Sequence, residues 1–67
     1  MTNTELLRKK LDASGYKLRF VASYIGITYQ AFLNKINNES EFRATEIQKL
    51  CSLLDIDVKD KEAIFFA

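Results

Sequence analysis

The stretch that decides the fold of this 67-residue chain is residues 17–38, which read KLRFVASYIGITYQAFLNKINN. Ala22 lies in the middle of one amphipathic segment, Gly26 follows it, and a second amphipathic segment comes next. Two helices joined by a short turn cross at a large angle. The first helix then needs a small residue at the crossing, and the turn needs the positive φ that glycine adopts most readily. The stretch therefore predicts a helix-turn-helix, with helices over residues 17–25 and 29–36.

Apolar residues also recur with helical spacing on both sides of this stretch. Leu7 and Leu11 share one face of a helix that Gly15 ends, because glycine tolerates the left-handed conformation found after helix C-termini. The further predicted helices cover residues 4–13, 44–54 and 58–64. No proline interrupts any of them. The chain is therefore predicted to be all-α, a compact five-helix domain that spans residues 1–67.

The composition narrows the chemistry that the chain can perform. Cys51 is the single cysteine and there is no histidine, which removes an internal disulfide, the commonest metal ligand and the commonest general base. No glycine-rich phosphate loop is present. We therefore expect no enzyme activity, no metal, no cofactor and no small-molecule ligand. The apolar runs are shorter than the roughly 20 residues of a membrane span and no signal peptide is evident, so we expect a cytoplasmic protein with no membrane partner.

The charges are distributed unevenly along the chain. Residues 1–35 carry six Lys and Arg against two Asp and Glu, a net charge of +4. Residues 36–67 carry four against seven, a net charge of −3. A basic half on a chain of net charge +1 suits a polyanion such as nucleic acid on one side of the molecule.

Residues 17–38 resemble the helix-turn-helix of the lambda-repressor-like family, the phage repressor and Cro type. The segments SEFRATEIQKL and IFFA are similar to small phage or prophage repressors of bacteria. The resemblance implies a five-helix domain that binds double-stranded DNA and regulates transcription, most simply as a repressor. It also implies a homodimer on a roughly palindromic operator, with half-sites about one helical turn apart.

The same resemblance assigns roles to residues by their position. The helix over residues 29–36 would enter the major groove, where an amide side chain can pair with adenine through two hydrogen bonds. The residues implied to read base edges are Tyr29, Gln30 and Asn34. The residues implied to contact phosphates are Lys17, Arg19, Thr28, Lys35, Asn37, Asn38 and Arg43, with Thr28 alternatively capping its helix.

Two positions depart from the family pattern. The family usually has a phosphate-binding glutamine as the first residue of the motif, and this chain has Leu18. Close relatives often begin the fourth helix with a Ser or Thr cap, and this chain has Arg43. Lys17 or Arg19 would replace the missing glutamine contact, and Arg43 would exchange a cap for a phosphate contact.

Aromatic residues near the end of the chain suggest an assembly. A core of 67 residues is marginal without a partner, and Phe65 and Phe66 are bulky for an exposed tail. Val58 and Phe42 would extend the same patch. We therefore predict a homodimer interface formed by these four residues.

Two other functions fit parts of the pattern. A protein-interaction module of the same fold, such as an antirepressor or antitoxin partner, would carry apolar anchors on the outer face of the helix over residues 29–36. Gln30, Asn34 and Lys35 are polar, whereas Leu33 and Tyr29 keep this alternative open. RNA binding would call for an aromatic sheet surface or a basic helix, and neither is evident.

Overall fold

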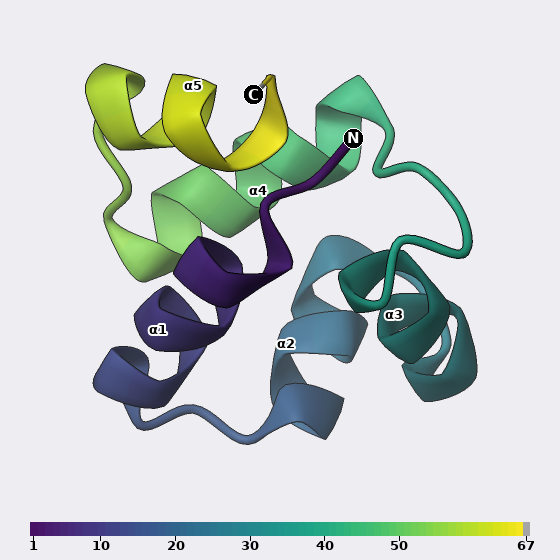
Figure 1. Ribbon diagram of the computed structural model, residues 1–67. Helices are drawn as coiled ribbons and strands as arrows, with labels where there is room; N and C mark the ends of the chain where they lie inside the picture. The colour runs from purple at the N-terminus through teal and green to yellow at the C-terminus, as the bar shows by residue number, and fades with distance from the viewer. Residues whose placement is uncertain (67) are drawn as a thin grey trace.

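The computed structural model describes residues 1–66 (Figure 1). Its helices are α1 (Thr4–Ser14), α2 (Leu18–Ile25), α3 (Tyr29–Ile36), α4 (Ala44–Leu54) and α5 (Val58–Phe65). No strand occurs among these residues, and no helix among them is long and apolar enough to cross a membrane. The predicted all-α class and the five helices are confirmed. The bounds of α3 and α4 are as predicted, and each of the other helices differs by one residue at one end.

Side chains at the helix ends explain these bounds. Asn3 and Asp57 begin α1 and α5 by accepting hydrogen bonds from backbone N–H groups of the first turn. Ser14 extends α1 past its predicted end, and its hydroxyl donates to the carbonyl oxygen of Leu11 at 2.6 Å. Lys17 precedes α2 instead of belonging to it, and α2 has no side-chain cap, because an ammonium group cannot accept a hydrogen bond.

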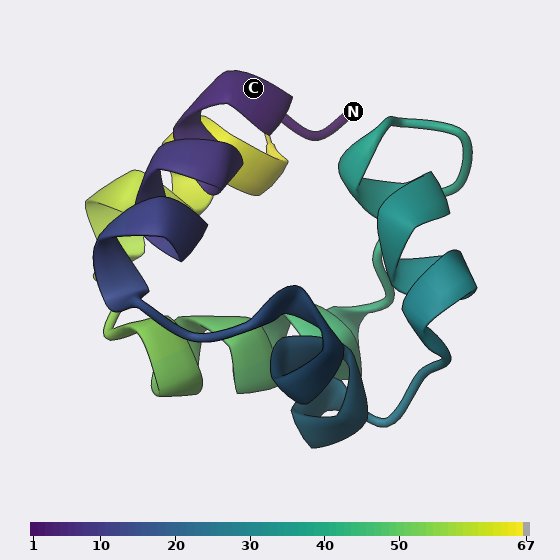
Figure 2. The ribbon, with the colours of Figure 1, turned by 90° about the horizontal axis from the view of Figure 1, so that it is seen from below.

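The helices surround one core from three sides. Figure 2 shows α1 and α5 together on one side, α3 on the side that faces them, and α2 and α4 along the third side between them. The ammonium of Lys10 lies 2.8 Å from Oδ2 of Asp60, and the backbone N–H of Asn3 donates to the carbonyl oxygen of Ile64 at 2.6 Å. These two contacts join α1 to α5, while α3 presents an outer face to solvent.

The turn between α2 and α3 has the geometry that the sequence predicts. Ala22 is buried in the core, as are Phe32 and Ile36 on the inner face of α3. Gly26 has φ of 87°, and the N–H groups of Gly26 and Ile27 both donate to the carbonyl oxygen of Ala22 at 3.0 Å. This is the left-handed cap that ends a helix and redirects the chain. The placement of the helix-turn-helix is confirmed.

The aromatic residues predicted for the dimer interface do not form one exposed patch. Phe65 is 5% exposed and Phe42 8% exposed, and their ring centroids lie 5.6 Å apart in an edge-to-face contact. Phe42 also packs against Phe32. The inference that Phe65 belongs to an exposed tail is wrong, because α5 runs to Phe65 and turns its ring into the core. Val58 and Phe66 remain exposed.

Gly26→Val is expected to lower the free energy of unfolding by about 1–3 kcal/mol. A Cβ at Gly26 meets no atom within 4 Å, so the cost comes from the backbone conformation alone. Gly26→Asn is the matched control, because asparagine tolerates positive φ better than valine does. Urea unfolding of the three proteins measures the difference. Equal stability of the valine and asparagine variants would contradict the argument from backbone conformation.

Candidate nucleic-acid interface

The third helix has one buried face and one polar face. Phe32 and Ile36 are fully buried against the core, and Thr28 caps the first turn, its hydroxyl accepting from the Ala31 amide at 3.1 Å. The capping role predicted for Thr28 is confirmed. The opposite face carries Gln30, which is exposed, and Asn34, which is half-buried. The packing of α3 therefore fixes which side chains face outward.

The two amides on this outer face are joined to each other. Nε2 of Gln30 donates to Oδ1 of Asn34 at 3.1 Å, a pairing made possible by the i, i+4 spacing. The Gln30 amide keeps its oxygen and its second N–H, and the Asn34 amide keeps both of its N–H donors. Together they present an acceptor and several donors, which is the chemistry needed to read base edges in a major groove.

A cation–π contact joins α2 to the start of α3. The guanidinium carbon of Arg19 lies 4.2 Å from the centroid of the Tyr29 ring. This stacking covers one face of the ring and leaves the guanidinium N–H groups available at its edge. Arg19 and Tyr29 thus form one surface at the N-terminal end of α3, beside Gln30.

Lys35 is bound within the fold. Its ammonium lies 2.6 Å from Oε1 of Glu46, and the two side chains are only 13% and 7% exposed. The same carboxylate oxygen accepts from the backbone N–H of Arg43 at 2.9 Å. Burial opposes ionisation of Glu46, yet the Lys35 ammonium and the Arg43 amide together hold its pKa below the ordinary value. Lys35 therefore ties α3 to α4 and is taken out of the set of phosphate contacts.

Glu46 is a residue that the sequence analysis missed. It stands three positions after Arg43, the spacing of a capping box in which a glutamate bonds back to the residue that precedes the helix. Arg43 itself makes no side-chain cap, and its side chain is exposed at the N-terminus of α4. The three-residue spacing between Arg43 and Glu46 is the feature of the sequence from which the contact of Glu46 with the backbone of Arg43 could have been predicted.

The two asparagines after α3 also have partners. Oδ1 of Asn37 accepts from the guanidinium of Arg8 at 2.7 Å. Asn38, with φ of 62°, accepts from the Thr2 amide at 3.0 Å and donates to the Thr2 carbonyl oxygen at 2.8 Å. These bonds hold the segment between α3 and α4 against the start of the chain. Asn37 and Asn38 are still exposed and keep N–H donors for a further partner.

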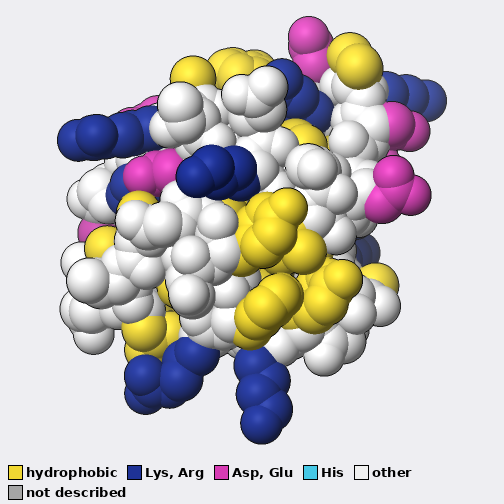
Figure 3. All heavy atoms as spheres, turned by 180° about the vertical axis from the view of Figure 1, so that it is seen from behind, with side chains coloured by type: hydrophobic (Ala, Val, Ile, Leu, Met, Phe, Trp, Pro, Cys, Tyr) yellow, Lys and Arg dark blue, Asp and Glu magenta, His cyan; other side chains and the backbone are white. Residues whose placement is uncertain are grey.

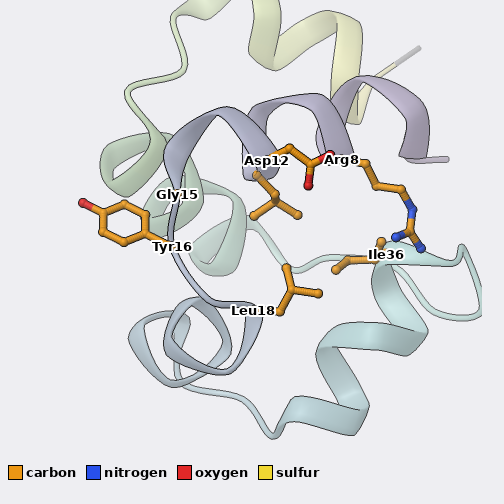
Figure 4. Close-up of a pocket in the computed structure, with 7 residues that line it drawn as sticks. Arg8, Asp12, Gly15, Tyr16, Leu18 and Ile36 are labelled. Carbon is orange, nitrogen blue, oxygen red and sulfur yellow. The ribbon is translucent and has the colours of Figure 1, made fainter.

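A groove of about 250 Å³ lies between α1, the start of α2 and the end of α3 (Figure 4). Leu18 and Ile36 line it on one side, and Arg8 and Asp12 extend from α1 on the other. Lys17, which is exposed, stands beside it at the N-terminus of α2. Leu18 contributes no hydrogen-bond donor there, whereas Arg8 brings a guanidinium to the end of α3, beside Ile36. The sequence analysis did not select Arg8.

A family model described as the Cro/C1-type HTH DNA-binding domain matches residues 6–60 of the chain. The matched segment includes the whole of α2, the turn and α3. Comparison with curated proteins returned no match, and comparison with solved structures returned none.

Proposed function

Because the chain belongs to the Cro/C1-type HTH DNA-binding domain family, we propose that it is a transcriptional repressor of the phage or prophage type that recognises a specific operator. In this proposal α3 lies in the major groove of double-stranded DNA. The observation that carries the proposal is the amide pair of Gln30 and Asn34 on the outer face of a helix whose inner face is buried.

The base-reading residues of the proposal are Tyr29, Gln30 and Asn34. Gln30 is the most exposed of the three, and its amide can bond to N6 and N7 of adenine while it keeps its bond to Asn34. Tyr29 has one ring face covered by Arg19, so its free edge is the part that can contact a thymine methyl group.

The phosphate contacts of the proposal surround α3 and carry no sequence information. The set consists of Lys17, Arg19, Thr28, Asn37, Asn38 and Arg43. Arg8 joins it, because it lines the groove and its guanidinium is bonded to Asn37 at the end of α3.

We further propose that the repressor acts as a homodimer through Val58 and Phe66. Val58 is 75% exposed and Phe66 is 63% exposed. Phe66 borders a groove of about 310 Å³ that is also lined by Phe42, Ile47 and Phe65. A symmetric pair of copies would read a roughly palindromic operator with half-sites about one helical turn apart.

Selection from random duplex DNA, followed by sequencing, tests the proposal as a whole. We expect recovery of a palindromic motif whose half-sites are separated by about one helical turn. Recovery of a single unpaired half-site would contradict the proposed dimer, but it would still support base recognition by α3. Failure to enrich any motif would contradict sequence-specific recognition.

Single substitutions distinguish residues that recognise base edges from residues that contact phosphates and so position the protein on the duplex. Gln30→Ala should weaken binding to the preferred duplex by about 1–3 kcal/mol and leave binding to scrambled duplex nearly unchanged. Arg43→Ala should weaken binding to both duplexes alike and reduce the salt slope by about one unit. Binding isotherms at several salt concentrations measure both effects. Unchanged discrimination in Gln30→Ala would favour the protein-interaction module instead.

A further inference from the structure

Three aromatic side chains form a row that begins just before α2 and continues along the outer face of that helix. Tyr16, Phe20 and Tyr24 follow one another at i, i+4 and i+8, and they are 43%, 49% and 45% exposed. The ring centroids lie 5.3 Å apart between Tyr16 and Phe20, and 6.3 Å apart between Phe20 and Tyr24. We call these three residues the aromatic stripe.

The aromatic stripe is separate from the core. Val21, Ala22 and Ile25 bury the inner face of α2, whereas Phe20 and Tyr24 form a second apolar face that stays nearly half exposed among residues 1–66. Tyr16 borders the groove between α1, the start of α2 and the end of α3, and its ring points away from the other labelled residues that line it (Figure 4). Figure 3 views the side of the molecule on which α2 and α4 lie, and it shows hydrophobic side chains gathered at the surface with Lys and Arg side chains projecting below them.

Positive charges predominate beside the aromatic stripe, although Asp12 lines the same groove as Tyr16, together with Arg8. Lys17 and Arg19 are exposed, and no Asp or Glu occurs between Asp12 and Glu39. Lys17 follows Tyr16 directly before α2, and Arg19 precedes Phe20 in the first turn of the helix. The stripe is therefore an apolar strip flanked by positive charges, and a negatively charged, partly apolar partner complements it.

Size and charge together disfavour a second copy of this chain as that partner. Three aromatic side chains exposed by nearly half offer roughly 250–350 Å². A stable protein–protein interface takes about 800 Å² from each side. Symmetric pairing of two stripes would also bring Lys17 and Arg19 of both copies together, and like charges repel. A short segment of another protein meets both constraints.

We propose that the aromatic stripe is a docking surface for an acidic amphipathic helix of a partner protein. Apolar side chains of that helix would lie along Tyr16, Phe20 and Tyr24, and its carboxylates would pair with Lys17 and Arg19. The stacking between neighbouring rings holds the surface in order before binding, which reduces the entropy lost on docking. Docking of an amphipathic helix through its apolar face is a recurrent mode of peptide recognition. The docking surface shares Lys17 and Arg19 with the proposed phosphate contacts, and the peptide test below is carried out without DNA.

The probe for the test is a synthetic helical peptide with leucines along one face and glutamates beside them. Titration into isotope-labelled protein, followed by NMR, should shift the resonances of residues 16–24. Phe20→Ser should weaken peptide binding at least tenfold, and a peptide with lysine in place of glutamate should bind at least tenfold more weakly. Val58→Ser is the control for the loss of an exposed apolar side chain, because Val58 is 75% exposed on α5 against 49% for Phe20, and it should leave peptide binding unchanged.

Three results would overturn the proposal. The first is a set of shifted resonances that lies outside residues 16–24. The second is equal binding of the acidic and basic peptides, or an unchanged affinity in both Phe20→Ser and Tyr24→Ser. The third is self-association of the wild type that Phe20→Ser abolishes in sedimentation experiments, which would assign the stripe to a second copy. Circular dichroism of both serine variants confirms that a lost affinity does not reflect unfolding.

Discussion

Phe65→Ala is expected to lower the free energy of unfolding by about 3–5 kcal/mol. The Phe65 ring is 5% exposed and packs edge-to-face against Phe42, so alanine leaves a cavity where the end of α5 meets the core. A domain of this size has a total stability of the same order, on the order of 0.05–0.15 kcal/mol per residue. We therefore expect the variant to be partly or wholly unfolded at room temperature.

Phe66→Ala is the matched control for this prediction. The neighbouring ring is 63% exposed, so its removal should change the stability of the monomer by less than about 0.5 kcal/mol. If the proposed homodimer uses Phe66, sedimentation should instead show weaker association of Phe66→Ala. Equal stability losses in the two variants, measured by chemical denaturation, would contradict the burial difference between them.

Glu46→Ala is expected to lower the free energy of unfolding by about 3 kcal/mol. The substitution leaves the ammonium of Lys35 buried without its carboxylate partner and removes the acceptor for the backbone N–H of Arg43. Because these bonds connect the end of α3 to the start of α4, any folded fraction should also bind its operator more weakly. Chemical denaturation measures the first effect, and binding isotherms at matched folded concentration measure the second.

The double variant Lys35→Met/Glu46→Leu is the informative control. Replacing a buried ion pair with apolar side chains of similar volume is often neutral, because neither charge has to leave water. We expect it to recover most of the stability that Glu46→Ala loses, apart from the hydrogen bond to the Arg43 amide. A double variant no more stable than Glu46→Ala would contradict the explanation by an unpaired lysine.

The Glu46 carboxyl also predicts how stability depends on pH. Its pKa in the folded protein lies below the ordinary value of 4.5, so the unfolded chain binds the proton more tightly than the folded chain does. This contribution is fully present above about pH 4.5 and is lost as the pH falls through the lower folded value. Glu46→Gln should remove that part of the acid dependence. Parallel acid-unfolding curves of the two proteins would contradict the assignment.

Local chemistry along the chain was enough to predict the helices and the turn. Helix ends depend on neighbouring residues: Thr28 caps α3 through a bond to an amide three residues later, and Gly26 supplies the left-handed turn. The buried faces of the helices follow from the 3.6-residue period. Ala22, the small residue expected at the helix crossing, is buried, and Gln30, expected on the outer face of α3, is exposed.

The sequence by itself therefore determined the all-α class, the helix-turn-helix and the outer face of α3, because each depends on contacts within a few residues. Only the tertiary structure decided whether the side chains of Phe65 and Lys35 are buried or face solvent. Whether Phe65 points into the core depends on how α5 docks beside the segment carrying Phe42. Whether Lys35 faces solvent depends on Glu46, eleven residues away on another helix. Such contacts are set by how helices pack, and helical periodicity within one segment does not contain that information.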